Sequence, residues 1–235
     1  MMKLNNQNKS VFVQNVFNQV FNKYDLMNDI MSLGVHRFWK KQFINWLAPL
    51  NNKKLLDMAC GSGDIVNLFI NYTKNNCQID AIDANTKMIS IGKKRLKNYK
   101  NINWNIGNAE KLKFKDNTFD YYTISFGIRN VSNINKALSE AFRVLKPGGR
   151  FMCLEFSKIQ NRHLDKIYQL YSKNIPKIGK FIVGNSKPYN YLINSIEDFY
   201  NQDELLELIK KNKFYKSEYR NLSGGVVAIH SAWKV

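Results

Sequence analysis

The overlapping segments 54-KLLDMA-59 and 57-DMACGSGD-64 join a short apolar strand to a turn that contains glycine. The turn opens a helix at about Ile65, where backbone N–H groups can meet a ligand. A dinucleotide fingerprint needs a third glycine for close packing of helix on strand, and Val66 occupies that position. The turn therefore disfavours a nicotinamide or flavin dinucleotide and favours a ligand without pyrophosphate.

Outward from this turn, short apolar runs alternate with helical patterns. We expect strands at 54–59, 78–83, 102–107, 119–126 and 150–156. A helix over 133–146 begins after Ser132 as its N-cap and stops at 147-PGG-149. The alternation predicts a parallel sheet with helices on both faces.

The C-terminal part predicts a helix from Asp203 to Asn212 and then an antiparallel hairpin, 215–222 and 226–233, around Ser223-Gly224-Gly225. Together these patterns predict an α/β, Rossmann-like fold. Its seven-stranded, mostly parallel sheet would carry a C-terminal antiparallel hairpin.

Charge and cysteine usage set broad limits on the partners. The chain of 235 residues has 36 Lys and Arg against 18 Asp and Glu, a formal net charge of +18. Such a charge attracts phosphate polymers or anionic lipid surfaces, although a Lys- and Asn-rich composition without a selected partner explains it equally well. Cys60, Cys77 and Cys153 are too few and too scattered for a disulfide framework or a zinc site. We expect a reducing compartment and no bound metal.

The N-terminus lacks the apolar stretch of a secretory signal, and no apolar run approaches the roughly 20 residues of a membrane span. We therefore expect a cytoplasmic protein, or a peripheral one at the inner face of a membrane.

Acidic and amide residues follow the predicted strands. Asp83 ends the second strand at close to the roughly 20-residue offset from Gly61 at which an acid reaches ribose hydroxyls. S-adenosylmethionine has ribose hydroxyls but no pyrophosphate. Asn108 after the third strand can read an adenine edge, and Ser125 and Phe126 after the fourth face the ligand crevice. These positions favour S-adenosylmethionine as the cofactor.

Four long segments extend the pattern: 23-KYDLMNDIMSLGVHRFWK-40, 116-DNTFDYYTISFGIRNV-131, 143-RVLKPGGRFMCLEFSK-158 and 222-LSGGVVAIH-230. On these segments the chain resembles the ubiquinone/menaquinone biosynthesis C-methyltransferase family, a class I methyltransferase group, nearly end to end. These long matches are far more discriminating than the G-x-G turn, which any class I methyltransferase shares.

The turn and the resemblance together give the candidate cofactor-binding residues: Asp57, Gly61, Ser62, Gly63, Asp83, Asn108, Ala109 and Ser125. The resemblance implies Asp83 on the ribose, Asn108 and Ala109 at the adenine, and Ser125 beside the cofactor. Ser62 stands where relatives have Thr, and both residues supply a hydroxyl.

The resemblance also implies transfer of a methyl group to a ring carbon of a polyprenylated quinol. Arg129 and Asn130 follow the fourth strand and can hold a developing phenolate. Because a guanidinium is a poor base, Arg129 is a candidate electrostatic stabiliser; the alternative is that it pairs with an acidic neighbour and braces the loop. Asp25 and His36, in the cap, are alternative bases.

One domain is expected to cover residues 1–235, because no linker or repeat separates a second one. It divides into an N-terminal helical cap (1–50), a cofactor-binding core (51–157), a substrate-covering insertion (158–200) and a C-terminal helix with its hairpin (201–235). In the cap, apolar spacing predicts one helix between Phe12 and Tyr24 and a second from Phe38 to Leu47, before Pro49.

Residues 158–187 form a basic amphipathic pattern that can line a prenyl groove and touch a membrane surface, or simply expose a solvated face. An RNA methyltransferase remains an alternative because of the charge, but no appended nucleic-acid module appears, and we expect no specific nucleic acid partner. A non-catalytic scaffold of a quinone-synthesis assembly is the other alternative. A homodimer, or association with other enzymes of quinone synthesis, stays open.

Overall fold

The computed structural model describes residues 28–29, 32, 34–183 and 187–235. Its helices are α3 (His36–Leu47), α4 (Asp64–Tyr72), α5 (Thr86–Arg95), α6 (Ile134–Val144), α7 (Arg162–Val183), α8 (Lys187–Glu197) and α9 (Gln202–Lys211). Its strands are β1 (Lys53–Met58), β2 (Cys77–Asp83), β3 (Ile102–Ile106), β4 (Phe119–Ser125), β5 (Leu145–Phe156), β6 (Tyr215–Leu222) and β7 (Val227–Trp233). Short 3-10 turns, η2 (Ile128–Asn130) and η3 (Ser223–Gly225), follow β4 and β6.

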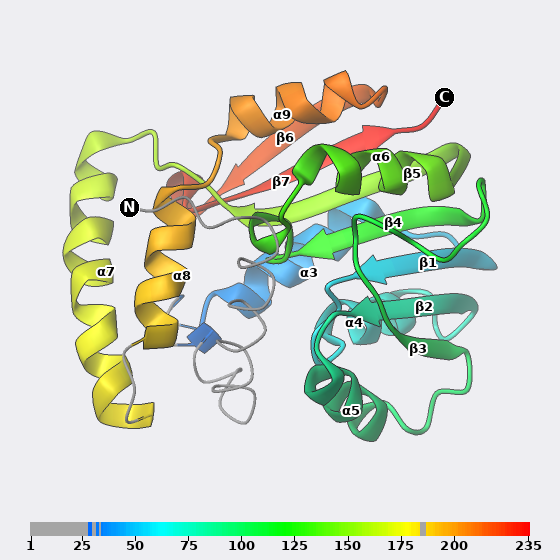
Figure 1. The fold of residues 1–235 in the computed structure, drawn as a ribbon, viewed down its shortest axis with the longest axis horizontal. Coiled ribbons are helices and arrows are strands. Elements are labelled where there is room, and N and C mark those ends of the chain that lie inside the picture. Colours follow the sequence, from blue (N-terminus) through cyan, green and yellow to red (C-terminus); the bar gives the residue numbers. More distant parts are fainter. Residues whose placement is uncertain (1–27, 30–31, 33, 184–186) are drawn as a thin grey trace.

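The described strands form one seven-stranded sheet in the order β3-β2-β1-β4-β5-β7-β6 (Figure 1). Strands β1 to β5 pair in parallel, whereas β7 runs antiparallel to both β5 and β6. The hairpin thus returns its second strand, β7, to pair with β5 from Arg150↔Trp233 to Phe156↔Val227. The mostly parallel sheet with a C-terminal hairpin, expected from the sequence, is confirmed.

Two apolar layers cover the sheet because successive strand residues face opposite sides. Leu55 of β1 belongs to a cluster with α3 and α4, and its neighbour Leu56 belongs to a cluster with α6 and α9. Both leucines are fully buried. The sheet is therefore the middle layer between two sets of helices, and its carboxyl edge is left for a ligand.

The boundary between α6 and β5 differs from the expected one. Helix α6 ends at Val144, and β5 already begins at Leu145, so Pro147 lies inside the strand rather than before it. Leu145 pairs with Phe119 and Arg150 pairs with Tyr121, so β5 has extra residues between these two pairs, a bulge opposite β4. Strand β5 is longer than the apolar run 150–156 because it also includes Leu145 and the bulge residues that follow it.

The N-cap of α6 is Asn133, not the expected Ser132. The Asn133 Oδ1 atom accepts the Lys136 backbone N–H at 3.0 Å, whereas the Ser132 backbone N–H donates to Glu110 at 2.9 Å. An asparagine oxygen caps a helix as well as a serine hydroxyl does, so the sequence alone did not separate the two neighbours.

The insertion holds two helices: α7 lies within the basic amphipathic pattern of 158–187, and α8 follows it. Asn161 caps α7 by accepting the backbone N–H groups of His163 and Leu164. The two helices pack on each other and stand beyond the carboxyl ends of β4 and β5 (Figure 1). Of the helices in the described ranges, none is both long and apolar enough to cross a membrane.

The expected second helix of the cap is α3, which begins two residues earlier than predicted, at His36. Trp39, Phe43 and Leu47 bury one face of α3 against the sheet. A left-handed residue, Ala48, ends the helix before Pro49. The helix expected between Phe12 and Tyr24 lies outside the described residues.

Candidate functional site

The turn after β1 has a backbone that only certain residues adopt easily. Gly63, the N-cap of α4, has φ +85°, and a Cβ atom there would lie 2.8 Å from the Trp104 ring. Glycine is therefore required at this position both for its positive φ and for the close approach of the indole. The turn places its backbone at the carboxyl edge of the sheet, as expected.

Asp83 ties this turn to the end of β2. Its Oδ2 atom accepts the backbone N–H of Gly61 at 2.9 Å, and its Oδ1 atom accepts that of Asn85 at 2.8 Å. Burial raises the pKa of the Asp83 carboxyl, and these backbone N–H groups oppose that rise. Each carboxylate oxygen retains a lone pair, so Asp83 can still accept hydrogen bonds from ligand hydroxyls.

A cavity of about 750 Å³ opens beside Asp83 at the carboxyl edge of the sheet. It brings together six of the residues predicted from the sequence: Gly61, Asp83, Asn108, Ala109, Ser125 and Asn130. Phe126 also lines the cavity, as expected. Five other predicted residues are not among its lining: Asp57, Ser62, Gly63, His36 and Arg129. Asp25 lies outside the described residues.

Asp57 lies beneath the turn rather than in the cavity. The Thr123 hydroxyl donates to its Oδ1 atom at 2.7 Å, whereas its buried Oδ2 atom has no hydrogen bond from the described residues. Burial raises the pKa of Asp57 to about 7, and the Thr123 hydrogen bond opposes the rise. Ser62 and Gly63 are buried in the same turn. Asp57, Ser62 and Gly63 thus belong to the turn and not to the lining of the cavity.

The hydroxyl of Ser125 indicates what kind of ligand the cavity can hold. Its Oγ atom is buried and, among the described residues, has no hydrogen-bond partner, although Ser125 lines the cavity. Buried hydroxyls normally have a partner, so this atom has capacity for a ligand. The Asp83 carboxylate at a strand end and this hydroxyl fit the ribose hydroxyls and the polar methionine end of S-adenosylmethionine.

Asn108 and Ala109 line the far side of the cavity. The Asn108 Oδ1 atom accepts the backbone N–H of Glu110 at 2.9 Å, which holds the amide in place and leaves its N–H groups for another partner. Ala109 is buried beside it. A held amide next to a small apolar residue has the chemistry to meet the edge and face of a purine.

Arg129 pairs with an acidic neighbour, as in the alternative interpretation of its role. Its Nη1 atom donates to Glu155 Oε1 at 2.6 Å and to the Phe126 carbonyl at 2.8 Å, and its guanidinium lies 5.4 Å from the centre of the Phe156 ring. The side chain is buried. Arg129 thus braces the loop after β4, and its role toward a phenolate stays a prediction.

His36 lies at the start of α3 and pairs with Asp29. The His36 Nε2 atom lies 3.0 Å from Asp29 Oδ1, and Arg37 also contacts the same carboxylate. Burial lowers the pKa of His36, Lys40 lowers it further, and Asp29 opposes both. A neutral imidazole can accept a proton, but within the described residues nothing places His36 in the cavity.

Two residues that contact the site, Tyr191 and Glu155, were not predicted from the sequence. Tyr191 of α8 donates its hydroxyl to Asn130 Oδ1 at 2.8 Å. Glu155 holds Arg129, and it stands as an acid in the apolar run 150-RFMCLEF-156. A carboxylate in a buried strand needs a partner, so Glu155 was open to prediction, whereas no motif marks Tyr191.

Solved structures that share this fold include S-adenosylmethionine-dependent methyltransferases, and the fold class is that of these proteins. A structure from Thermotoga maritima, described as an S-adenosylmethionine-dependent methyltransferase and possible histamine N-methyltransferase, superposes with a TM-score of 0.65. It is 18% identical and covers 94% of this chain and 99% of its own. The complex between the Haloferax volcanii Trm112 methyltransferase activator and the putative methyltransferase gives a TM-score of 0.70 at 14% identity, with 94% and 96% covered.

Residues 1–234 match the model of the ubiE/COQ5 methyltransferase family, and the chain belongs to that family. A ubiquinone/menaquinone biosynthesis C-methyltransferase UbiE from Rickettsia bellii is 49% identical over 240 residues, which cover 99% of this chain and 96% of the relative. The protein of the same name from Bartonella quintana is 47% identical, with 99% and 92% covered. The resemblance and the S-adenosylmethionine-dependent methyltransferase activity expected from the sequence are confirmed.

Proposed function

We propose that the protein transfers a methyl group from S-adenosylmethionine to a ring carbon of a polyprenylated quinol in ubiquinone or menaquinone synthesis. The observation that carries the proposal is the cavity at the carboxyl edge, where Asp83, Ser125 and Asn130 meet in a chain of this family. Relatives at 49% identity are named as C-methyltransferases of that synthesis. The acceptor is therefore a quinol precursor, a benzoquinol or a naphthoquinol.

In this proposal the turn and the strand ends hold the cofactor. Asp83 accepts the ribose hydroxyls, Asn108 and Ala109 meet the adenine, and Ser125 satisfies its hydroxyl on the cofactor. Gly61, Ser62 and Gly63 shape the turn, and Asp57 supports it from below. Bound S-adenosylmethionine supplies an electrophilic methyl group.

The remaining task of the protein is to orient an electron-rich ring. Loss of a proton from a ring hydroxyl makes the neighbouring carbon nucleophilic, and a held phenolate is aligned with the methyl group. Transfer of the methyl group leaves S-adenosylhomocysteine, and the methylated carbon then releases its hydrogen as a proton so that the ring becomes aromatic again. Asn130 lines the cavity and can donate to the phenolate oxygen. Arg129 adds positive charge behind it, reduced by the pairing with Glu155. The candidates that take the proton are a water polarised by these groups, His36 and Asp25.

The test is methyl transfer from labelled S-adenosylmethionine to reduced short-prenyl benzoquinol and naphthoquinol precursors, with total RNA in parallel. Label on a ring carbon supports the proposal, and the ratio of the two products gives the acceptor preference. Label on RNA alone would establish the RNA methyltransferase alternative instead. Cofactor binding without any transfer would favour the scaffold.

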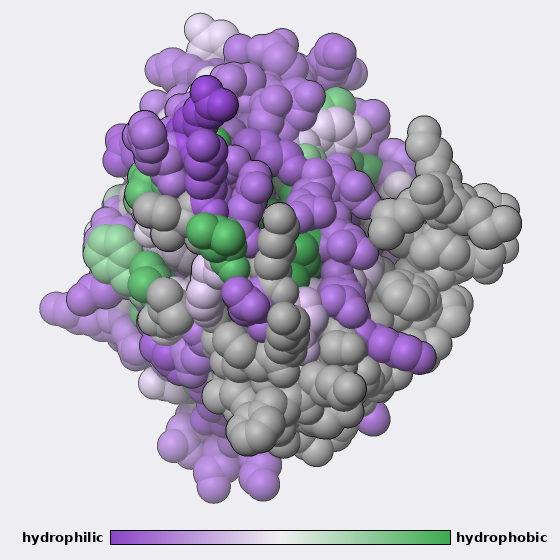
Figure 2. Space-filling model, turned by 90° about the vertical axis from the view of Figure 1, so that its left-hand side faces the viewer, coloured by the Kyte–Doolittle hydropathy of each residue, from purple (hydrophilic) through white to green (hydrophobic). Residues whose placement is uncertain are grey.

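We propose in addition that the α7 face contacts an anionic membrane, where a prenylated acceptor resides. Figure 2 shows this side of the molecule, with apolar patches among hydrophilic surface. Leu164 and Leu170 of α7 are 45% and 67% exposed, and the basic Arg162 and Lys166 are exposed beside them. Exposed leucines beside cations match a headgroup boundary.

Vesicles of phosphatidylglycerol and phosphatidylcholine test this contact by cosedimentation. We expect the double variant Leu164→Ser, Leu170→Ser to lose binding and high salt to weaken the wild type. Ile106→Ser, which removes an exposed apolar residue from β3, is the matched control. Equal binding of all three proteins would remove α7 from the contact.

A further inference from the structure

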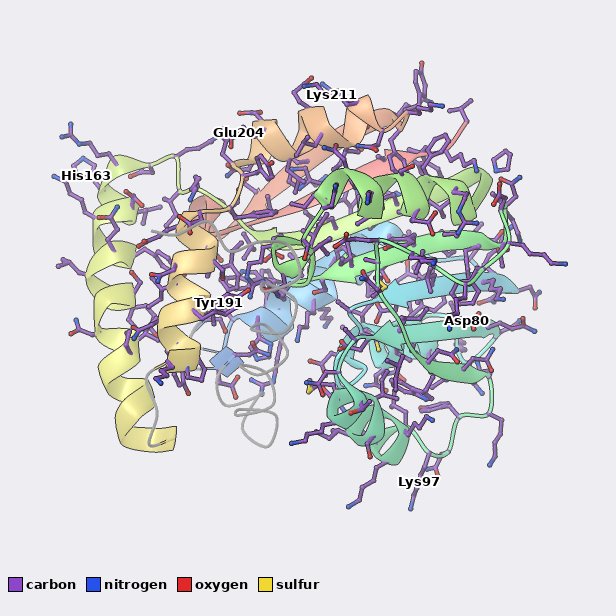
Figure 3. The ribbon with its side chains drawn as sticks, viewed as in Figure 1. Asp80, Lys97, His163, Tyr191, Glu204 and Lys211 are labelled. Atoms are coloured by element: carbon purple, nitrogen blue, oxygen red, sulfur yellow. The ribbon has the colours of Figure 1, made fainter. Side chains whose placement is uncertain are left out.

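Asn130 stands between the cofactor cavity and the insertion. It ends the η2 turn after β4 and lines the cavity. Helix α8 packs on this turn, and the Tyr191 hydroxyl donates to Asn130 Oδ1 at 2.8 Å. Figure 3 shows Tyr191 on the side of α8 that faces the sheet. One hydrogen bond therefore connects the insertion to a side chain of the cavity.

This hydrogen bond decides which end of the amide Asn130 presents. A carboxamide has its acceptor oxygen and its donor N–H groups on opposite sides. When Oδ1 is held by Tyr191, the N–H groups point away from Tyr191. Without that donor the amide can rotate and present its oxygen, which would repel a phenolate.

The Tyr191 phenol keeps its proton and therefore remains a hydrogen-bond donor. Burial raises the pKa of Tyr191 to about 12, Glu155 raises it as well, and Arg129 opposes the rise. The phenol therefore stays protonated at physiological pH and cannot become a negative group beside Asn130. Its position is fixed by α8, whose residues Tyr189 and Leu192 are buried.

We propose that Tyr191 is a positioning residue of the methyl transfer: it orients the Asn130 amide so that the amide N–H groups meet the acceptor oxygen that becomes a phenolate. The inference rests on the proposed function and adds to it a residue outside the motifs of the cofactor site. Because Tyr191 belongs to the insertion, correct placement of α8 completes the site for the acceptor.

The experiment is a double-mutant cycle on full-length protein with the short-prenyl quinol that the wild type methylates. Tyr191→Phe lowers kcat about tenfold, the size expected when one oriented hydrogen bond is lost, with the affinity for S-adenosylmethionine unchanged. Asn130→Ala lowers kcat at least as much, and the double variant is no slower than Asn130→Ala alone. Tyr219→Phe, which removes a phenol that donates to Asp203, keeps the wild-type kcat.

A merely structural role for Tyr191 gives a different result. In that case the two substitutions multiply their effects, or Tyr191→Phe leaves kcat unchanged, and either outcome overturns the inference. Asn130→Asp keeps an acceptor for Tyr191 but has no N–H donor, so it loses turnover while its melting temperature stays near that of the wild type. If the wild type labels no quinol, the proposed function fails and the inference fails with it.

Discussion

Arg129 and Glu155 form an ion pair with 2.6 Å between Nη1 and Oε1, and their side chains are only 4% and 1% exposed. The pair joins the turn after β4 to the end of β5, at the edge where the cavity opens. Breaking such a pair leaves an uncompensated charge in a buried place, which costs more than the pair contributes. Any change at Arg129 therefore alters the frame of the site as well as its charge.

The first prediction follows from this pair. Arg129→Met lowers the free energy of unfolding by about 3 to 5 kcal/mol, because Glu155 stays buried without its cation. The double variant Arg129→Met, Glu155→Met loses less than the sum of the two single variants. Urea denaturation measures all four proteins. Additive losses would show that the two side chains do not compensate each other.

Turnover of the same variants separates bracing from catalysis. We expect Arg129→Met to lower kcat while cofactor affinity stays intact, because Arg129 does not line the cavity. If the double variant regains stability but not turnover, the guanidinium acts on the acceptor. Full recovery of turnover would leave Arg129 with the bracing role alone.

A second prediction concerns Asp83. Asp83→Ala removes the acceptor of the Gly61 and Asn85 backbone N–H groups together with the proposed ribose contact. Affinity for S-adenosylmethionine, measured by titration calorimetry, falls by about 10- to 100-fold, the size of hydrogen bonds to a charged group. Asp80→Asn, in the same strand but outside the cavity, is the control. Unchanged affinity of Asp83→Ala would contradict the ribose assignment.

A third prediction tests how closely two turns of the site approach. A Cβ atom on Gly127 would lie 2.4 Å from the Cβ of Ala59, and Ala59 itself has φ +55°. Gly127→Ala therefore destabilises the protein by about 1 to 3 kcal/mol and weakens cofactor binding. Adding Ala59→Gly removes the clashing methyl group and relieves the positive φ, so the double variant regains most of the melting temperature. A double variant as unstable as Gly127→Ala would contradict this close approach.

Much of the fold could be predicted because periodicity and turn residues agree along the core. The strands around Leu55 and Leu56 are apolar on both faces, which is typical of a parallel sheet, and the glycine turn after β1 needs positive φ. The predicted start of the fifth strand, at residue 150, was wrong. Pro147 and Gly148 signal a stop, whereas a bulge opposite β4 lets β5 begin at Leu145 and continue through them. Pairing across the sheet outweighed local propensity there.

The cofactor half of the site was easier to predict than the acceptor half. Asp83 and Asn108 follow strands, and the ends of parallel strands meet at one edge of the sheet, so their meeting follows from topology. Tyr191 reaches Asn130 from a helix 61 positions further along the chain, and its contact depends on how α8 packs. Hydrophobic periodicity predicts which face of a helix is buried, but it does not predict which residues that face contacts.

The last prediction is the dependence of stability on pH from His230 in β7. Burial lowers the pKa of His230 to about 4, the Gln202 carbonyl opposes the shift, and that carbonyl lies 2.9 Å from Nε2. Above about pH 6.5 the imidazole is neutral in both states. As the pH falls below this value, the unfolded chain binds a proton that the folded protein cannot, so stability decreases down to about pH 4. Each unit of pKa difference corresponds to about 1.4 kcal/mol, and the full loss is roughly 3 kcal/mol.

Urea denaturation between about pH 7.5 and pH 4.5 measures this loss. His230→Gln keeps a neutral donor for Gln202 and has nothing to titrate, so its stability is lower at neutral pH but falls less on acidification. The gap between wild type and variant narrows by roughly 2 to 3 kcal/mol over that range. His163→Gln, an exposed position on α7, follows the wild-type curve. Parallel curves for wild type and His230→Gln would show that His230 binds its proton as readily in the folded protein as in the unfolded chain.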